Sequence, residues 1–171
     1  MEQKDAALPL SGVTVVDFSR LLPGPWATQM LGEFGADVIK VEQPGIGDPS
    51  KFNAPNYRKN SVYYNAVNAD KRSIAIDMTS ADGKAVAERL LRRADVVMES
   101  FRPGVAAKLG VDYDTVSAYN ARVIYCAISG FGQTGPLSKV AGHDFVIQAL
   151  SGVLGIGVDQ VVVAASDTDV I

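Results

Sequence analysis

Ala36-Asp-Val-Ile-Lys-Val-Glu42 and Ala94-Asp-Val-Val-Met-Glu99 are two stretches of matching shape. Short runs that are rich in β-branched residues predict strands. Similar runs at 13–18, 73–78 and 123–128 predict three further strands. We interpret the two matching stretches as equivalent structural units rather than as a true sequence repeat.

Helical patterns alternate with these strands. Pro25 suits a first helical position, and apolar residues then recur at helical spacing up to Gly35. Thr79 and Asp82 are spaced like a capping box before a helix over 84–93. Shorter helices are expected over 105–109, 112–119 and 144–150.

The alternation of strands and helices predicts an α/β fold. It favours a Rossmann-like, mostly parallel sheet with helices on both faces. Right-handed crossovers would place the carboxyl ends of all the strands on one edge. Residues 43–66 form a long polar connection, which is expected to be functional or to carry short structure of its own.

The composition describes a mildly acidic protein with one ordinary core. The chain has 171 residues, 47% of them hydrophobic, and a net charge of −3. Its lysines and arginines are scattered, which argues against a nucleic-acid surface. No apolar run approaches the ~20 residues of a membrane span, and no signal-peptide pattern is visible. The single Cys126 cannot form an internal disulfide, so we expect a buried core thiol and a cytoplasmic protein.

A glycine-rich loop follows the apolar run 122–128, which is expected to be a buried strand. The loop, Gly130-Phe-Gly-Gln-Thr-Gly-Pro136, stands where α/β folds build ligand sites, and the segment near the amino terminus is expected beside it. His143, the single histidine, comes directly before Asp144. Histidine suits proton transfer, although a structural role is the simpler alternative. The chain has neither metal-ligand spacing nor a GxSxG motif, so we expect no zinc site and no hydrolase nucleophile.

Three other short segments have both a binding and a structural interpretation. The loop 19–25 leads from a strand into a helix, where free amide groups favour an anion, or it is a simple turn. Lys71-Arg72 either holds phosphates or is a solvated pair at a strand edge. Phe101-Arg-Pro-Gly104 either stacks on and neutralises a nucleotide or is a surface turn.

The carboxyl-terminal residues depart from this pattern. A β-type run follows Gly157 and reaches the last residue without a cap, so residues 158–171 are expected to be a truncated or divergent tail. The tail carries Asp167 and Asp169, and a desolvated carboxylate can act as a nucleophile or a base. The other expected boundaries are a flexible amino terminus over 1–8 and a ligand-binding portion over 9–157.

A series of short motifs occurs in the order typical of one family. They are Leu10-Ser-Gly-Val-Thr-Val-Val-Asp-Phe18 with Gly24-Pro25, residues 32–42, Gly47-Asp48, Asn68-Ala-Asp-Lys-Arg-Ser73, residues 94–99, residues 101–104, Leu109-Gly110, and residues 129–136 with Asp144 and Ser151-Gly152. Together they resemble the amino-terminal part of the class III CoA-transferases (CaiB/BaiF-like proteins), a family that also contains the 2-methylacyl-CoA racemases. The resemblance covers roughly residues 8–157.

This resemblance implies a large domain that binds CoA along the carboxyl ends of its strands, present here in part. CoA or acyl-CoA would be a substrate, together with a carboxylic acid acceptor, and no permanently bound cofactor or metal is expected. Full-length members are interlocked homodimers. The CoA contacts carried over by position are Arg20, Leu21, Leu22, Gln43, Lys71, Arg72, Ile76, Ser100, Phe101, Val105, Lys108 and Leu109. Gln43 stands where some relatives have arginine, and Ser100 where asparagine is frequent.

The resemblance leaves three functions open. In the transferases an aspartate attacks the acyl-CoA thioester and carries CoA as an aspartyl thioester; Asp167 is the nearest match, and Asp169 is second. In the racemases a histidine and an aspartate exchange the α-proton, and His143 matches that pattern. The third alternative is an inactive, truncated CoA-binding fragment, which should expose apolar surface.

Overall fold

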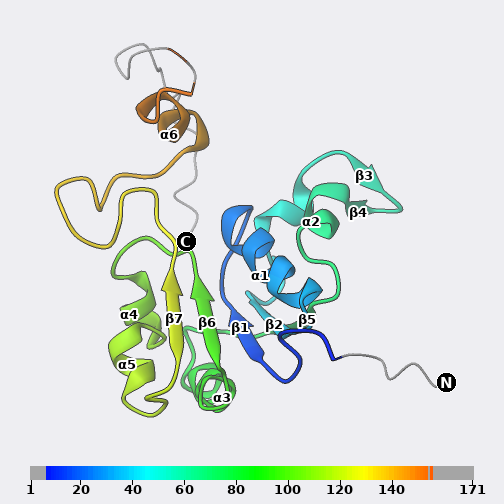
Figure 1. Ribbon diagram of the computed structural model, residues 1–171, viewed down its shortest axis with the longest axis vertical. Coiled ribbons are helices and arrows are strands. Elements are labelled where there is room, and N and C mark those ends of the chain that lie inside the picture. Colours follow the sequence, from blue (N-terminus) through cyan, green and yellow to red (C-terminus); the bar gives the residue numbers. More distant parts are fainter. Residues whose placement is uncertain (1–6, 154, 156–171) are drawn as a thin grey trace. The chain divides into compact units, whose positions relative to one another are not determined.

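The computed structural model describes residues 7–153 and 155, and their contacts divide the chain into two compact units, residues 1–128 and 129–171. The first unit contains a five-stranded sheet in the order β5-β2-β1-β6-β7 (Figure 1). Among the described residues, no helix has the length and apolar character needed to cross a lipid bilayer.

The large sheet is parallel throughout. Val16 lies opposite Ile39 on one side and opposite Val97 on the other, so β1 occupies the centre. The predicted parallel α/β class and the five predicted strands are confirmed. The strands are β1 (Thr14–Asp17), β2 (Asp37–Glu42), β5 (Arg72–Ala75), β6 (Val96–Glu99) and β7 (Ile124–Ala127).

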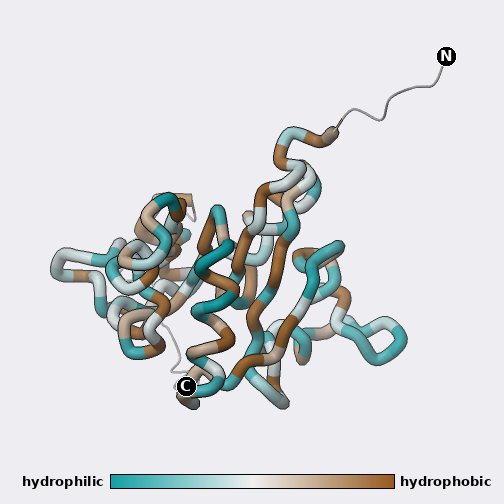
Figure 2. The backbone as a smooth tube through the Cα atoms, turned by 90° about the horizontal axis from the view of Figure 1, so that it is seen from below, coloured by the Kyte–Doolittle hydropathy of each residue, from teal (hydrophilic) through white to brown (hydrophobic). Residues whose placement is uncertain are grey.

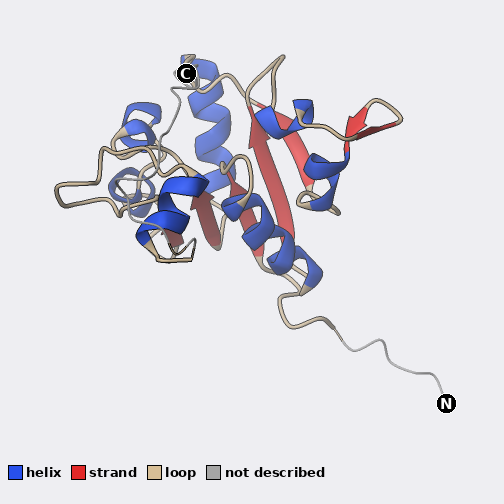
Figure 3. Cartoon of the chain, turned by 90° about the horizontal axis from the view of Figure 1, so that it is seen from above, coloured by secondary structure: helices blue, strands red, loops and turns tan. Residues whose placement is uncertain are grey.

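The strand order identifies a topological switch point. After β1 the chain moves outward to β2 and β5, then returns to β6 on the other side of β1. Right-handed crossovers in opposite directions place their helices on opposite faces of the sheet (Figure 3). This is the strand order of the Rossmann fold, in which ligands bind outside the carboxyl ends of the strands where the order reverses. The connecting helices are α1 (Pro23–Glu33), α3 (Ala81–Leu91), α4 (Val105–Leu109) and α5 (Tyr113–Ser117).

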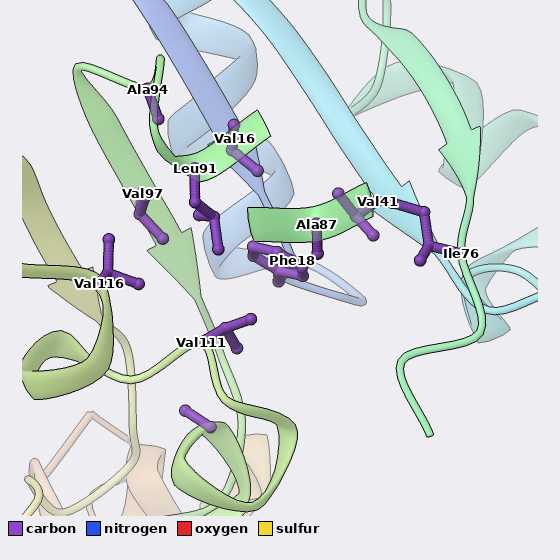
Figure 4. Close-up of a cluster of buried hydrophobic side chains, with 11 residues drawn as sticks. Val16, Phe18, Val41, Ile76, Ala87, Leu91, Ala94, Val97, Val111 and Val116 are labelled. Carbon is purple, nitrogen blue, oxygen red and sulfur yellow. The ribbon is translucent and has the colours of Figure 1, made fainter. Parts of the chain in front are cut away.

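The two faces of the sheet differ in chemistry, because successive strand residues point to opposite sides. One face carries the apolar core, where Val16, Phe18 and Val97 pack against Leu91 of α3 (Figure 4). In the tube coloured by hydropathy, apolar and polar segments alternate along the chain (Figure 2). The opposite face buries charged side chains, among them Asp17. This charged face is the part of the fold that positions the candidate site.

The long connection 43–66 carries short structure of its own, as one of the two sequence interpretations expected. Asp48 caps the first element by accepting a hydrogen bond from the amide of Ser50, and Ser61 caps the last by accepting from Tyr64. The elements are the 3-10 helix η1 (Pro49–Phe52), the paired strands β3 (Asn56–Tyr57) and β4 (Asn60–Ser61), and α2 (Val62–Ala66).

The prediction that residues 122–128 form a buried strand is wrong in one respect. The strand exists as β7, but it is the edge of the sheet and pairs only with β6 among the described strands. Ile124 is 65% exposed, and Cys126 is only partly buried. Apolar content does not distinguish a central strand from an edge strand whose outer side has no neighbour in this unit.

The predicted capping box at Thr79 and Asp82 is also wrong, by one residue. Ser80 is the N-cap of α3, and its hydroxyl accepts a hydrogen bond from the amide of Gly83 at 3.0 Å. Thr79 has another partner, because its amide and hydroxyl both donate to the carboxylate of Asp77. The threonine hydroxyl is therefore engaged in the turn before the helix, and the serine hydroxyl caps α3.

Replacing Gly83 by alanine should destabilise the protein, although alanine is the better helix former. A Cβ atom there would lie 1.9 Å from the carbonyl oxygen of Asp77. We expect a loss of about 1–3 kcal/mol in the free energy of unfolding, as for other overpacked sites. Gly32 of α1 is the matched control, since a Cβ there meets Val38 at an ordinary 3.5 Å. Gly32→Ala should instead raise the free energy of unfolding by up to about 1 kcal/mol. Urea denaturation measures both variants, and an equal loss of stability in the two would contradict the expectation.

The second unit contains the glycine-rich loop and α6 (Asp144–Leu150). Gly130 and Gly142 approach each other so closely that a Cβ on Gly130 would lie 2.6 Å from the Cα of Gly142. His143 is the N-cap residue of α6 but makes no side-chain cap hydrogen bond. The two glycines thus bring the loop and the residue before His143 together.

Candidate functional site

The loops that follow β1 and β6 meet at the topological switch point. The amide of Phe18 donates to the carbonyl of Met98 at 2.8 Å, and the amide of Arg20 donates to the Ser100 hydroxyl at 3.0 Å. The guanidinium carbon of Arg20 lies 5.9 Å from the centroid of the Phe101 ring. We call residues 19–22 and 100–104 the switch-point loops. They offer a cation and an aromatic ring at the place where this fold binds ligands.

Most of the predicted CoA contacts follow carboxyl ends of strands, so they belong to one edge of the sheet. Gln43 comes directly after β2, and Ile76 directly after β5, where its amide donates to the carbonyl of Glu42. Arg20 and Gln43 are exposed, whereas Ser100 and Phe101 are half-buried. The remaining residues of this group are Leu21 and Leu22 before α1, and Val105, Lys108 and Leu109 in α4.

The structure places the backbone of Lys71 and Arg72 at the amino end of β5, the opposite end of that strand from Ile76. Arg72 is the first residue of β5, and its guanidinium pairs with Asp37, the first residue of β2, at the amino ends of both strands. The Lys71 ammonium is buried, with a side chain only 2% exposed. The Lys71 ammonium reaches Asp17 at the end of β1, but it is inaccessible to a ligand, as is the Ile76 side chain in the apolar core.

Lys71 belongs to a buried polar cluster beneath the start of α1. Its ammonium lies 3.2 Å from the carboxylate of Asp17 and donates to the carbonyl of Pro25 at 2.7 Å and to the hydroxyl of Thr28 at 2.8 Å. Asp17 is fully buried, and it also accepts from Thr28 and from both the amide and the hydroxyl of Ser19. Burial lowers the pKa of Lys71 to about 8, against the pull of Asp17. The cluster fixes where β1 ends and α1 begins.

A second buried pair lies beside it. The Lys40 ammonium is 3.0 Å from the carboxylate of Asp48, and both side chains are essentially inaccessible to solvent. Lys40 also donates to the carbonyl of Ser19 at 2.9 Å, and Asp48 accepts from the amide of Leu21 at 3.3 Å. Burial alone would raise the pKa of Asp48, but the nearby Lys40 ammonium and the hydrogen bonds from Ser50 lower it.

Glu42 and Glu99 end two strands with buried carboxylates whose environments differ. Burial would raise the pKa of Glu42, but hydrogen bonds from Lys51 and Ser73 lower it below its usual value. Burial raises the pKa of Glu99, which accepts a hydrogen bond from the amide of Phe101 at 2.6 Å. Sequence reasoning missed these carboxylates, Lys40 and the role of Asp48. For Lys40 and Glu42, the available signal in the sequence was two charged residues at alternate positions of β2.

Acid should destabilise the protein through Asp48 and Glu42. A carboxyl group whose pKa is lowered by folding stabilises the native state above its unfolded pKa, and this stabilisation is lost as pH falls through the folded value. With ordinary values of 3.8 and 4.5, the loss should begin near pH 4.5 and deepen below it. Glu42→Gln should be less stable at pH 7 and lose less on acidification. Urea denaturation from pH 7 to 3 measures this, and an unchanged pH dependence in the variant would contradict it.

An open cavity of about 580 Å³ adjoins the same sheet edge, beside the ends of β2 and β5. Its lining is polar and aromatic and includes Gln43, Lys51, Phe52 and Tyr64. The Lys51 ammonium lies 4.9 Å from the centroid of the Tyr64 ring, and the Tyr64 hydroxyl donates to Glu42 at 3.2 Å. The cavity thus extends the row of predicted ligand contacts beyond Gln43.

Of the three predicted catalytic residues, the structure describes His143. Asp167 and Asp169 lie outside the described residues, as does the expected boundary at 157/158. His143 belongs to the second unit and is partly buried. Its neighbour Asp144 is exposed and accepts a hydrogen bond from Gln148 at 2.7 Å. Across residues 7–153 and 155, no group of three or more His, Cys, Asp or Glu side chains is arranged to hold a metal ion.

A family model described as "CoA-transferase family III" matches residues 10–162. The chain belongs to this family. The match includes both switch-point loops and the glycine-rich loop, and it confirms the resemblance that the sequence motifs indicated. As a family III CoA-transferase homologue, the chain comes from an enzyme family whose substrates are CoA thioesters.

Several similar proteins are named as CoA-transferases. The chain is 45% identical over 155 residues to a succinate–glutarate CoA-transferase of Agrobacterium fabrum, covering 86% of this chain and 39% of the relative. It is 40% identical over 146 residues to an acetyl-CoA:oxalate CoA-transferase of Acetobacter aceti, covering 85% and 38%. A crystal structure of a CaiB/BaiF family protein from Brucella suis superposes with a TM-score of 0.82 at 43% identity, covering 86% of this chain and 40% of that one. The chain thus spans about two fifths of the length of these relatives.

Proposed function

We propose that this chain forms the CoA-binding part of an enzyme that moves CoA from an acyl-CoA thioester to a carboxylic acid. The observation that carries the proposal is the junction of Arg20, Ser100 and Phe101 at the switch point of a family III fold. A guanidinium can pair with the phosphates of CoA, and an aromatic ring can pack against its apolar or aromatic parts. The adjoining cavity of about 580 Å³ has room for part of such a ligand.

A small dicarboxylic acid is the acceptor class that we favour. Relatives of this chain are named for succinate, glutarate and oxalate. These acids differ in length, but each has two carboxylates. An enzyme that uses them needs cations or amides near the reacting thioester to bind the carboxylate that does not react. The cavity offers asparagine amides of that chemistry, and the ammonium of Lys51, which is paired with Glu42 in the structure.

The transfer is proposed to proceed through an aspartyl intermediate, with Asp167 as the first candidate and Asp169 as the second. The aspartate oxygen attacks the thioester carbon and expels the CoA thiolate, which leaves a mixed anhydride. The thiolate then attacks the aspartyl carbonyl and releases the donor acid. The acceptor carboxylate attacks the carbonyl of this aspartyl thioester and expels the CoA thiolate, which forms a second mixed anhydride. The thiolate then attacks the acceptor's acyl carbon, which gives the acceptor acyl-CoA and frees the aspartate carboxylate. Each step exchanges one acyl bond for another.

We also propose that the active assembly is a homodimer in the cytoplasm. An exposed apolar stripe supports a protein contact: Leu22, Trp26, Met30 and Phe34 recur at four-residue spacing along α1, and all are exposed. The single, partly buried Cys126 fits a reducing compartment. Size-exclusion chromatography with light scattering tests the dimer.

A racemase is the second candidate function, and His143 is the observation that favours it. The side chain is partly buried beside a tight glycine contact and makes no cap hydrogen bond to α6. It would exchange the α-proton of an acyl-CoA together with a carboxylate on the opposite side.

One assay distinguishes these functions. The chain and the Agrobacterium fabrum relative are each incubated with succinyl-CoA and glutarate in deuterated water, and products and protein adducts are followed by mass spectrometry. Glutaryl-CoA and a CoA adduct on an aspartate are expected for transfer. Racemisation is tested in parallel with a 2-methylacyl-CoA and would give α-deuterium without transfer. CoA binding with neither reaction would show that this chain is a binding fragment.

A further inference from the structure

The loop after β1 adopts a backbone conformation that does not arise from its own sequence. Leu21 has φ = 68°, in the left-handed region that non-glycine residues rarely occupy. Such a conformation is strained, so it persists only where the surroundings determine it. Arg20, the neighbouring residue, carries the charge of the proposed CoA site. What holds Leu21 therefore also determines where Arg20 is presented.

Two of the contacts that hold this loop come from one buried ion pair. Lys40 of β2 donates to the carbonyl of Ser19, the residue before Arg20, at 2.9 Å. Asp48 accepts from the amide of Leu21, the residue after Arg20, at 3.3 Å. The two charges are 3.0 Å apart, with side chains 1% and 0% exposed. The pair thus fastens the backbone on both sides of Arg20.

The position of Asp48 is fixed in turn. Its Oδ1 atom accepts from the amide of Ser50 at 2.9 Å and from the Ser50 hydroxyl at 2.7 Å. The third support of the loop comes from β6, where Ser100 accepts from the amide of Arg20. Both partners of the ion pair and Ser50 are buried, so none of them can touch a ligand outside the switch-point loops.

We propose that Asp48, together with Lys40, is a positioning residue for CoA binding. It holds the loop at Leu21 so that the Arg20 guanidinium points into the switch-point site. This inference rests on the proposed function, because it takes CoA as the ligand of that site. A buried ion pair is often no more stabilising than apolar residues of the same shape, so its presence here is better explained by the conformation that it imposes.

A double-mutant cycle on CoA affinity tests the inference. Lys40→Met/Asp48→Ala removes both charges together, which avoids leaving one charge buried alone. Isothermal titration with CoA should show binding weakened about tenfold by this change in the natural background and less than twofold in an Arg20→Ala background. An equal loss in both backgrounds would overturn the positioning role while leaving the CoA site intact. No CoA binding by the unsubstituted chain would overturn the proposed function and, with it, this inference.

A milder variant covers the outcome that the paired substitution does not fold. Ser50→Ala keeps both charges and removes only the hydroxyl bond to Asp48. It should weaken CoA binding two- to threefold in the natural background and leave it unchanged in the Arg20→Ala background. In the absence of CoA, it should also shift the amide resonances of Arg20 and Leu21 in the natural background. Unchanged resonances together with unchanged affinity would contradict the proposal.

Discussion

Lys71→Met is expected to lower the free energy of unfolding by about 3–5 kcal/mol, because it leaves the buried carboxylate of Asp17 without its cation. The side chains of the pair are 2% and 0% exposed. Methionine fills much of the space of the lysine stem but cannot donate to Asp17, Pro25 or Thr28. Since a domain of ordinary size is stable by about 5–15 kcal/mol, this loss is a large share of the total.

The next residue provides the control. Arg72→Met also removes a cation from an ion pair, but its partner Asp37 is exposed, and the arginine side chain itself is 65% exposed. Exposed pairs contribute about 0–1 kcal/mol, so this variant should unfold close to the natural midpoint. Urea denaturation of both variants at pH 7 gives the comparison. Equal losses for Lys71→Met and Arg72→Met would refute the buried cluster.

Leu91→Ala is expected to cost about 2–5 kcal/mol, the range for deleting a large buried aliphatic side chain. Leu91 is 0% exposed and lies at the centre of the cluster that joins α3 to β1 and β6. Its loss leaves a cavity under the strands that carry both switch-point loops. At temperatures near unfolding, we therefore also expect weaker CoA binding, because those loops are then held less firmly.

Leu90→Ala is the control for that effect. It makes the same substitution in the same helix, at a position that is only partly buried. The change in helix propensity is identical, so any difference between the variants reports core packing. Thermal unfolding should show a clearly smaller loss for Leu90→Ala. Equal midpoints would contradict the placement of Leu91 in the core.

The fold class could be predicted from the sequence because strand and helix patterns alternate along the chain. Alternating β-branched runs and helical periods predicted the five strands of the large sheet and the helices α1, α3, α4 and α5, and the range 105–109 of a short helix agrees with α4. The predictions that failed depended on neighbours. Whether residues 122–128 form a central or an edge strand depends on which strands lie beside them. Whether Thr79 or Ser80 caps α3 depends on which of them donates hydrogen bonds to the Asp77 carboxylate.

The sequence predicted that residues after the strands share one edge of the sheet, but not the buried residues that hold those loops, and their role in binding CoA stays a prediction. Residues that follow strand ends, such as Arg20, Ser100 and Phe101, meet because parallel strands share a carboxyl edge. The burial of the Lys71 ammonium was not visible in the sequence, because a long side chain can turn inward as easily as outward. The role of Asp48 required the fold, because its partners Leu21 and Lys40 lie on other segments of the chain.

The central claim is that CoA binds at the switch-point loops, and amide chemical shifts of the ¹⁵N-labelled chain during a CoA titration test it most directly. We predict the largest changes at Arg20, Ser100 and Phe101, with smaller changes at Gln43 and along α4. Arg20→Ala should reduce all of them at a given CoA concentration. The absence of any change at these amides, or changes confined to residues away from the carboxyl edge of the sheet, would contradict the account.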